Sequence, residues 1–107
     1  MTKCEFFRDH ERITGFSVSG HSGYAEAGSD IVCAAITAAV AMAETTINDV
    51  CGGKEKVRVK EEDARITLTL PTACEEEDTI QSVLAGLMLY LISLRDDFED
   101  YIEVLEV

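Results

Sequence analysis

One histidine and one cysteine stand close enough along this chain to act on the same substrate. His21 follows Gly20 at the end of an apolar stretch, and Cys33 comes twelve residues later. A histidine can accept a thiol proton and later return it to a leaving amine, while a thiolate attacks a carbonyl carbon. The pair therefore predicts a thiol hydrolase, with Cys33 as the nucleophile and His21 as the general base. The alternative for His21 is a surface or turn histidine without a chemical role.

Cys33 falls in the first turn of a predicted helix. Ser29 is the predicted N-cap of this helix, and Asp30 lies in its first turn, where the helix dipole favours an anion. The free N–H groups at that end favour a thiolate and would also hold the oxyanion of a hydrolytic intermediate. The alternative is a small, buried cysteine in an alanine-rich helix, without any chemical role.

The segment between the two residues predicts a loop that folds back on itself. It contains Gly23 and Gly28, which allow the tight turns needed to bring the imidazole and the sulfur together. Asp30 is a candidate third member that orients His21, in the manner of a triad carboxylate. The other reading of Asp30 is an anion that serves only the start of the helix.

The remaining cysteines show no comparable pattern. Cys4, Cys51 and Cys74 have no histidine near them in sequence, and His10 lies in a charged turn. Paired ligand spacings are absent, so no metal is expected. The N-terminal residues do not resemble a secretory signal, which favours free thiols and a cytoplasmic location over disulfides.

Composition limits the remaining possibilities. The 107 residues fit a single domain over 1–107, and 47% of them are hydrophobic. A net charge of −12 argues against direct nucleic-acid binding and suits a basic partner, although solubility alone also accounts for it. The longest nearly apolar run, residues 31–43, is too short to span a membrane and predicts a buried helix.

Hydrophobic periodicity predicts an α+β fold with the element order ββαββαβ. A mostly antiparallel sheet of about five strands would carry two helices. Gly15 marks a bulge or a close backbone approach within the second strand. The predicted strands cover residues 3–8, 13–20, 56–60, 64–70 and 101–107, and the helices cover about 30–50 and 75–95.

Both predicted helices are apolar around most of their circumference. A sheet buries only one side of a helix, so the other side needs a partner. We therefore predict a homodimer. The alternative is that the two helices cover each other within one chain.

The motif around the histidine and the cysteine resembles a known family. Gly20-His21, followed by Gly28-Ser29-Asp30-Ile31-Val32-Cys33-Ala34-Ala35, is similar to the motif of the bacterial ribosomal-processing cysteine proteases, often called Prp. Chain length, acidic balance and element order fit over the whole chain. The resemblance implies that His21 and Cys33 are the catalytic pair and that Asp30 has a supporting role. The family usually carries serine four residues after the nucleophile, where Thr37 keeps a hydroxyl here, so the resemblance implies a supporting role for Thr37 as well.

The resemblance also implies a function. Such enzymes remove a short, basic N-terminal extension from the large-subunit ribosomal protein numbered twenty-seven, act as homodimers and need no cofactor. Their loop between histidine and cysteine is thought to be mobile and to order around the substrate. The competing hypothesis is a non-enzymatic, acidic module that binds ribosomal proteins during assembly and keeps Cys33 buried. The loop residues in this chain include Gly20, Ser22, Gly23, Tyr24, Gly28 and Ser29.

Overall fold

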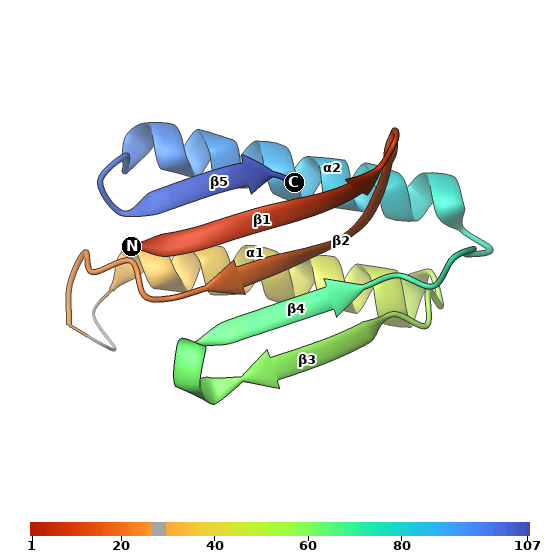
Figure 1. The fold of residues 1–107 in the computed structure, drawn as a ribbon, viewed down its shortest axis with the longest axis horizontal. Coiled ribbons are helices and arrows are strands. Elements are labelled where there is room, and N and C mark those ends of the chain that lie inside the picture. The colour runs from red at the N-terminus through yellow and green to blue at the C-terminus, as the bar shows by residue number, and fades with distance from the viewer. Residues whose placement is uncertain (27–29) are drawn as a thin grey trace.

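One five-stranded sheet carries two helices on one of its faces in the computed structural model, which describes residues 1–26 and 30–107 (Figure 1). The strands lie in the order β3-β4-β2-β1-β5, and every neighbouring pair is antiparallel except β1 and β5. The predicted α+β class and element order are confirmed. The elements are β1 Thr2–Asp9, β2 Arg12–Ser19, α1 Ile31–Thr45, β3 Lys56–Lys60, β4 Arg65–Thr69, α2 Glu77–Asp97 and β5 Ile102–Glu106.

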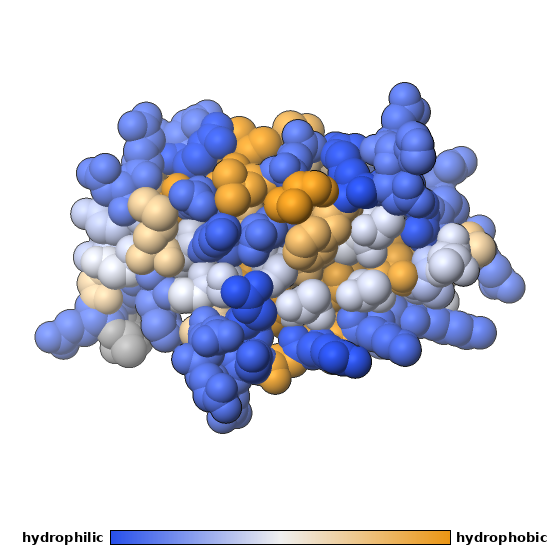
Figure 2. Space-filling view, in the orientation of Figure 1, coloured by the Kyte–Doolittle hydropathy of each residue, from blue (hydrophilic) through white to orange (hydrophobic). Residues whose placement is uncertain are grey.

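The core lies between the sheet and the two helices. Phe6 and Phe16 face each other across β1 and β2, with ring centroids 5.8 Å apart, and both are fully buried. The opposite sheet face carries none of the helices formed by the described residues, and Figure 2 shows that hydrophilic side chains cover most of it. Period-two alternation along the strands thus separates a core face from a solvated face. Fully buried partners from the other elements are Val32 of α1, Leu68 of β4, and Ile80, Leu84 and Leu91 of α2.

Gly15 meets both conditions predicted for it. A Cβ built on this residue would lie 2.2 Å from the carbonyl oxygen of Leu68, so β2 and β4 can approach only because the side chain is absent. The pairing of β1 with β2 also becomes irregular between Phe7 and Arg8, opposite this point. β4 pairs with β2 at this close approach, which places the β3–β4 hairpin next to β2. The hairpin forms one wall of the groove described below.

Helix α1 continues through a single π-helical turn, Thr46–Val50, and the chain then turns at Gly52 with φ +62°. The combined segment Ile31–Val50 is long and apolar enough to span a membrane. Its sheet-facing residues nevertheless belong to the core of the domain, as predicted from the apolar run. The buried residues are Val32, Ile36, Val40, Ala43 and Ile47.

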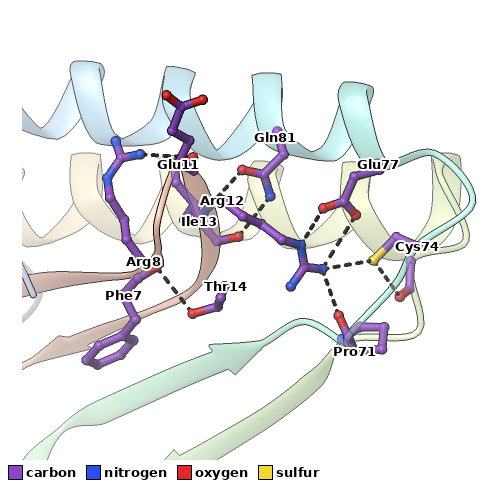
Figure 3. Close-up of polar contacts among 11 residues, drawn as sticks. Phe7, Arg8, Glu11, Arg12, Ile13, Thr14, Pro71, Cys74, Glu77 and Gln81 are labelled. Atoms are coloured by element: carbon purple, nitrogen blue, oxygen red, sulfur yellow. Dashed lines mark hydrogen bonds and ion pairs between the residues drawn. The ribbon is translucent and has the colours of Figure 1, made fainter.

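A polar network joins the start of α2 to the first hairpin (Figure 3). Arg12 pairs with the Glu77 carboxylate, which lowers the pKa of Glu77, and donates to the Pro71 carbonyl at 2.7 Å. The Gln81 amide accepts from the Ile13 N–H and donates to the Ile13 carbonyl, both at 2.8 Å. These contacts, between residues far apart in the chain, fix α2 against β2.

Candidate active site

Cys33 lies in the first turn of α1 and is half-buried. Its sulfur faces Ser22 of the preceding loop, which is itself 2% exposed. The Ser22 backbone N–H donates to Sγ at 3.4 Å, and the thiol donates to Ser22 Oγ at 3.4 Å. The sulfur also borders a surface groove, so the interpretation of Cys33 as a fully buried core cysteine does not hold.

Asp30, rather than the predicted Ser29, is the N-cap of α1. Its backbone is extended, with φ −80° and ψ 99°, and its Oδ1 accepts from the amides of Val32 and Cys33 at 3.0 Å each. Aspartate caps a helix as well as serine does, and composition alone did not separate two adjacent candidates. Gly28 and Ser29 lie outside the described residues.

The capping role of Asp30 corrects a second expectation. The amides of Val32 and Cys33 already donate to its side chain, and the amide of Ala34 donates to its carbonyl oxygen at 3.1 Å. These helix-start donors are therefore engaged in this structure and are not open to a substrate oxyanion.

The second oxygen of Asp30 accepts a hydrogen bond from the Ser22 hydroxyl. This bond, followed by those from Cys33, lowers the pKa of Asp30 to about 2, so the group is a carboxylate at neutral pH. Among the described residues, no hydrogen bond joins Asp30 to His21. In this structure Asp30 contacts the nucleophile's side of the site, and its predicted role in orienting His21 stays a prediction.

His21 is exposed and borders the same groove as Cys33. The preceding Gly20 adopts φ +82°, and a Cβ there would lie 2.7 Å from the Met1 carbonyl oxygen, so glycine is required for the turn that places His21. No hydrogen bond joins the imidazole to the Cys33 sulfur among the described residues. The fold thus brings both predicted residues to one groove without a hydrogen bond between their side chains.

The groove lies between α1 and the β3–β4 hairpin and has a volume of about 510 Å³. Val18, Ile36 and Val40 form an apolar floor, while Val59 and Ile66 come from the hairpin. Thr37, one helical turn beyond Cys33, also borders it, as its predicted supporting role requires. An open, apolar trough with a thiol and an imidazole at one end can hold an extended peptide beside the two reactive groups.

Tyr24 packs the first part of the loop, residues 20–26, against the rest of the domain. Gly23 adopts φ +76°, and the Tyr24 ring packs edge-on against Phe98 and Tyr101, with centroid distances of 5.4 Å and 5.2 Å. These contacts tie the loop to the segment that precedes β5. The described part of the loop therefore has a defined packing, and its predicted ordering around a substrate stays a prediction.

The other three cysteines have different surroundings. Burial raises the pKa of Cys4 to about 12, and burial is also the main reason that the pKa of Cys74 is raised. All four thiols are free, and Cys33 is the cysteine that borders the groove. Residues 1–26 and 30–107 contain no group of three or more side chains suited to a metal ion.

A thiol at a helix start and a histidine at a strand end, both facing one apolar groove of an α+β domain, define a small thiol hydrolase. Comparison with known proteins sharpens this class. The sequence profile of the cysteine protease Prp family matches residues 1–103. The chain therefore belongs to the cysteine protease Prp family, and the resemblance seen in the sequence is confirmed.

Similar proteins agree with this assignment. The ribosomal processing cysteine protease Prp of Bacillus subtilis (strain 168) is 26% identical over 107 residues, which cover 97% of this chain and 96% of that protein. The ribosomal processing protease Prp from S. aureus, with a covalently linked product peptide, has TM-score 0.89 at 18% identity, with full coverage of both chains. The same S. aureus protease with a substrate peptide has TM-score 0.85 at 17% identity, again with full coverage of both chains.

Family membership makes this chain a cysteine protease and sets aside the non-enzymatic binding module. The polar network of Arg12, Glu77 and Gln81, and the contact of Ser22 with both Asp30 and Cys33, were missed from sequence. These contacts join residues without a shared local motif, so no spacing pattern indicated them.

Proposed function

We propose that this protease removes the N-terminal extension of a large-subunit ribosomal protein in the cytoplasm during ribosome maturation. Cys33 is the nucleophile and His21 is the general base. The single observation that carries the proposal is the groove, because it joins both side chains to one trough open to solvent. The names of the B. subtilis and S. aureus relatives, which specify ribosomal processing, support the choice of substrate.

The proposed reaction uses only groups at the end of this groove. A substrate segment lies along α1 with its scissile carbonyl next to Cys33. Movement of the exposed His21 side chain brings the imidazole to the sulfur, and the proton passes from sulfur to imidazole as sulfur attacks the carbonyl carbon. The imidazolium then protonates the leaving amine, and water hydrolyses the thioester with His21 as the base. The described residues show no hydrogen bond between the two groups without substrate, which is compatible with this sequence of steps, since catalytic hydrogen bonds often form or tighten only on binding.

Charge favours a basic extension as the substrate. The chain carries 21 acidic and 9 basic residues, and its field attracts a positively charged segment. Glu44 and Glu61 border the groove and offer local partners, alongside Lys60 and Arg65 on the hairpin side. The apolar floor between them suits hydrophobic side chains near the scissile bond.

The test is cleavage of the ribosomal protein precursor encoded in the same genome, followed by mass spectrometry of the products. Cys33→Ala and His21→Ala should each abolish cleavage while circular dichroism shows an unchanged fold. Cys51→Ala is the matched control, because this thiol is half-buried but does not border the groove, and it should cleave normally. Normal cleavage by folded Cys33→Ala would overturn the assignment of the nucleophile.

We also propose that the protease acts as a homodimer through the outer faces of α1 and α2. A groove of about 600 Å³ runs between these helices, bordered by small residues of α1 such as Ala35 and Ala38 and by Tyr90 of α2. Met42 borders this groove and is 73% exposed, and a large apolar side chain left so exposed is typical of a surface that a partner covers. Met42→Glu should convert the dimer to a monomer in sedimentation equilibrium, whereas Val59→Glu on the separate β3 edge should not.

A further inference from the structure

The Ser22 hydroxyl is the least expected group at the site. It is buried and makes three hydrogen bonds: with the Asp30 carboxylate, with the Tyr24 N–H at 3.3 Å, and with the Cys33 thiol at 3.4 Å. A hydroxyl has one proton to donate and two lone pairs to accept with. All of its hydrogen-bonding capacity is therefore used.

The direction of each bond follows from its partners. Asp30 is ionised at neutral pH, since its pKa is lowered to about 2, and a carboxylate only accepts. The Ser22 proton must therefore point at Asp30. The Tyr24 N–H can only donate, so it takes one lone pair of Oγ. The sulfur then faces the remaining lone pair and must supply the hydrogen itself.

We infer that the Ser22 hydroxyl, whose proton points at Asp30, accepts a hydrogen bond from the Cys33 thiol and thereby favours the protonated sulfur in the free enzyme. A thiolate at the same place would face an oxygen lone pair at 3.4 Å without any hydroxyl proton between them. The Ser22 backbone N–H, which donates to the same sulfur at 3.4 Å, acts in the opposite direction and favours the thiolate. The hydroxyl and the backbone N–H of Ser22 thus have opposite effects on the protonation of the sulfur.

The inference rests on the proposed function only in that Cys33 is taken as the nucleophile. No covalent bond to Ser22 forms or breaks in this proposal. When substrate binds, the thiol proton passes to the His21 imidazole. The Ser22 hydroxyl keeps its own proton, which still points at the Asp30 carboxylate. A resting protease with a protonated sulfur would react slowly with electrophiles other than its substrate.

The test measures the rate of Cys33 alkylation by iodoacetamide in the free enzyme against pH, with peptide mapping by mass spectrometry to separate Cys33 from the other thiols. Ser22→Ala removes the hydroxyl acceptor and keeps the backbone N–H. Alkylation at pH 7 should be about fivefold to tenfold faster than in the wild type, as expected for loss of one hydrogen bond to the neutral form. The advantage should vanish at alkaline pH, where both proteins carry a thiolate.

A second variant changes the same hydrogen bond from the side of Asp30, and thermal unfolding at pH 7 checks that it is folded under the conditions of the assay. Asn caps helices as well as Asp does, and the Asn amide can donate to Ser22 Oγ. Asp30→Asn therefore releases the Ser22 proton to the sulfur and should also speed alkylation at pH 7. Ser17→Ala is the matched control and should leave the rate unchanged, because Ser17 is a buried serine on β2 whose hydroxyl contacts Arg65 and Thr67 rather than Cys33.

Equal or slower alkylation in both site variants would overturn the inference, because it would mean that the hydroxyl donates to the sulfur or does not affect it. A purely structural role for Ser22 would change thermal stability without producing a pH-dependent rate difference. Failure of the proposed function is recognised separately, since it requires that folded Cys33→Ala still cleaves the precursor.

Discussion

Replacement of Gln81 by methionine should destabilise the domain through the backbone of Ile13. The Gln81 amide is the hydrogen-bond partner of both the N–H and the carbonyl of Ile13, at 2.8 Å each (Figure 3). Ile13 is 3% exposed and lies next to the irregularity in the pairing of β1 with β2. Methionine has nearly the same length and keeps the packing, but it leaves both backbone groups without this partner.

The expected loss follows from those two groups. A buried backbone group without a partner costs about 1–3 kcal/mol, and water access beside the half-buried Gln81 places each cost near the lower end of this range. The free energy of unfolding should therefore fall by about 2–4 kcal/mol. For a chain of 107 residues, the unfolding entropy is about 0.22 kcal/mol/K, so the melting temperature should fall by about 9–18 °C.

Urea and thermal unfolding, followed by circular dichroism, measure this loss. Gln81→Glu adds a pH test. In this variant a carboxylate would face the Ile13 carbonyl oxygen, and this contact raises the pKa of the introduced carboxyl in the folded state above its value in the unfolded chain. Its stabilising form is then the protonated acid, so the variant should approach the wild type as pH falls and lose stability as pH rises. Ser82→Ala, at the exposed neighbouring position, should change nothing. A Gln81→Met protein within about 0.5 kcal/mol of the wild type would refute the reasoning.

Three further outcomes follow from the structure. Gly15→Ala places a Cβ 2.2 Å from the Leu68 carbonyl oxygen, so it should lower the free energy of urea unfolding by about 1–3 kcal/mol. Asp30→Asn loses the charge that the Ser22 bond stabilises. Because the pKa of Asp30 falls from 3.8 to about 2 on folding, the stability deficit of this variant should be complete above pH 4 and disappear as pH drops towards 2. Glu44→Gln should raise KM for a basic precursor with little change in kcat, because Glu44 borders the groove about 16 Å along α1 from the nucleophile.

Local patterns in the sequence predicted the fold and selected two candidate residues, His21 and Cys33, that the structure places at one groove. Alternation along residues 56–60 and 64–70 was enough to place the second hairpin, because one face of each strand is apolar and the other carries charged or polar residues. Gly52 and Gly53 were expected to end the first helix because glycine readily adopts positive φ there, and Gly52 has φ +62°. The parallel pairing of β1 with β5 was not predicted, since it depends on how α2 returns the chain to the sheet.

The chemistry around the nucleophile was less accessible from sequence for a specific reason. The helix start was recognised as a place that favours an anion, but the anion it holds in this structure is Asp30, which takes the amides of Val32 and Cys33. A sequence identifies donors and acceptors without saying which of them pair. The decisive partner, Ser22, lies eleven residues before the sulfur and follows no helical or strand period relative to it.

His21 and Cys33 are therefore positioned by different kinds of contact, one local in the chain and one across the loop. His21 is placed by backbone constraints next to it, namely the end of β2 and the positive φ of Gly20. The hydrogen bonding of Cys33 depends instead on a contact across the loop, through a hydroxyl whose direction is set by Asp30. If the Ser22 hydroxyl does hold the thiol proton, the contact between Ser22 and Cys33 must open before the imidazole can accept that proton. Faster alkylation of Ser22→Ala than of the wild type is therefore the result that would connect the hydrogen bonding of Cys33 to its reactivity.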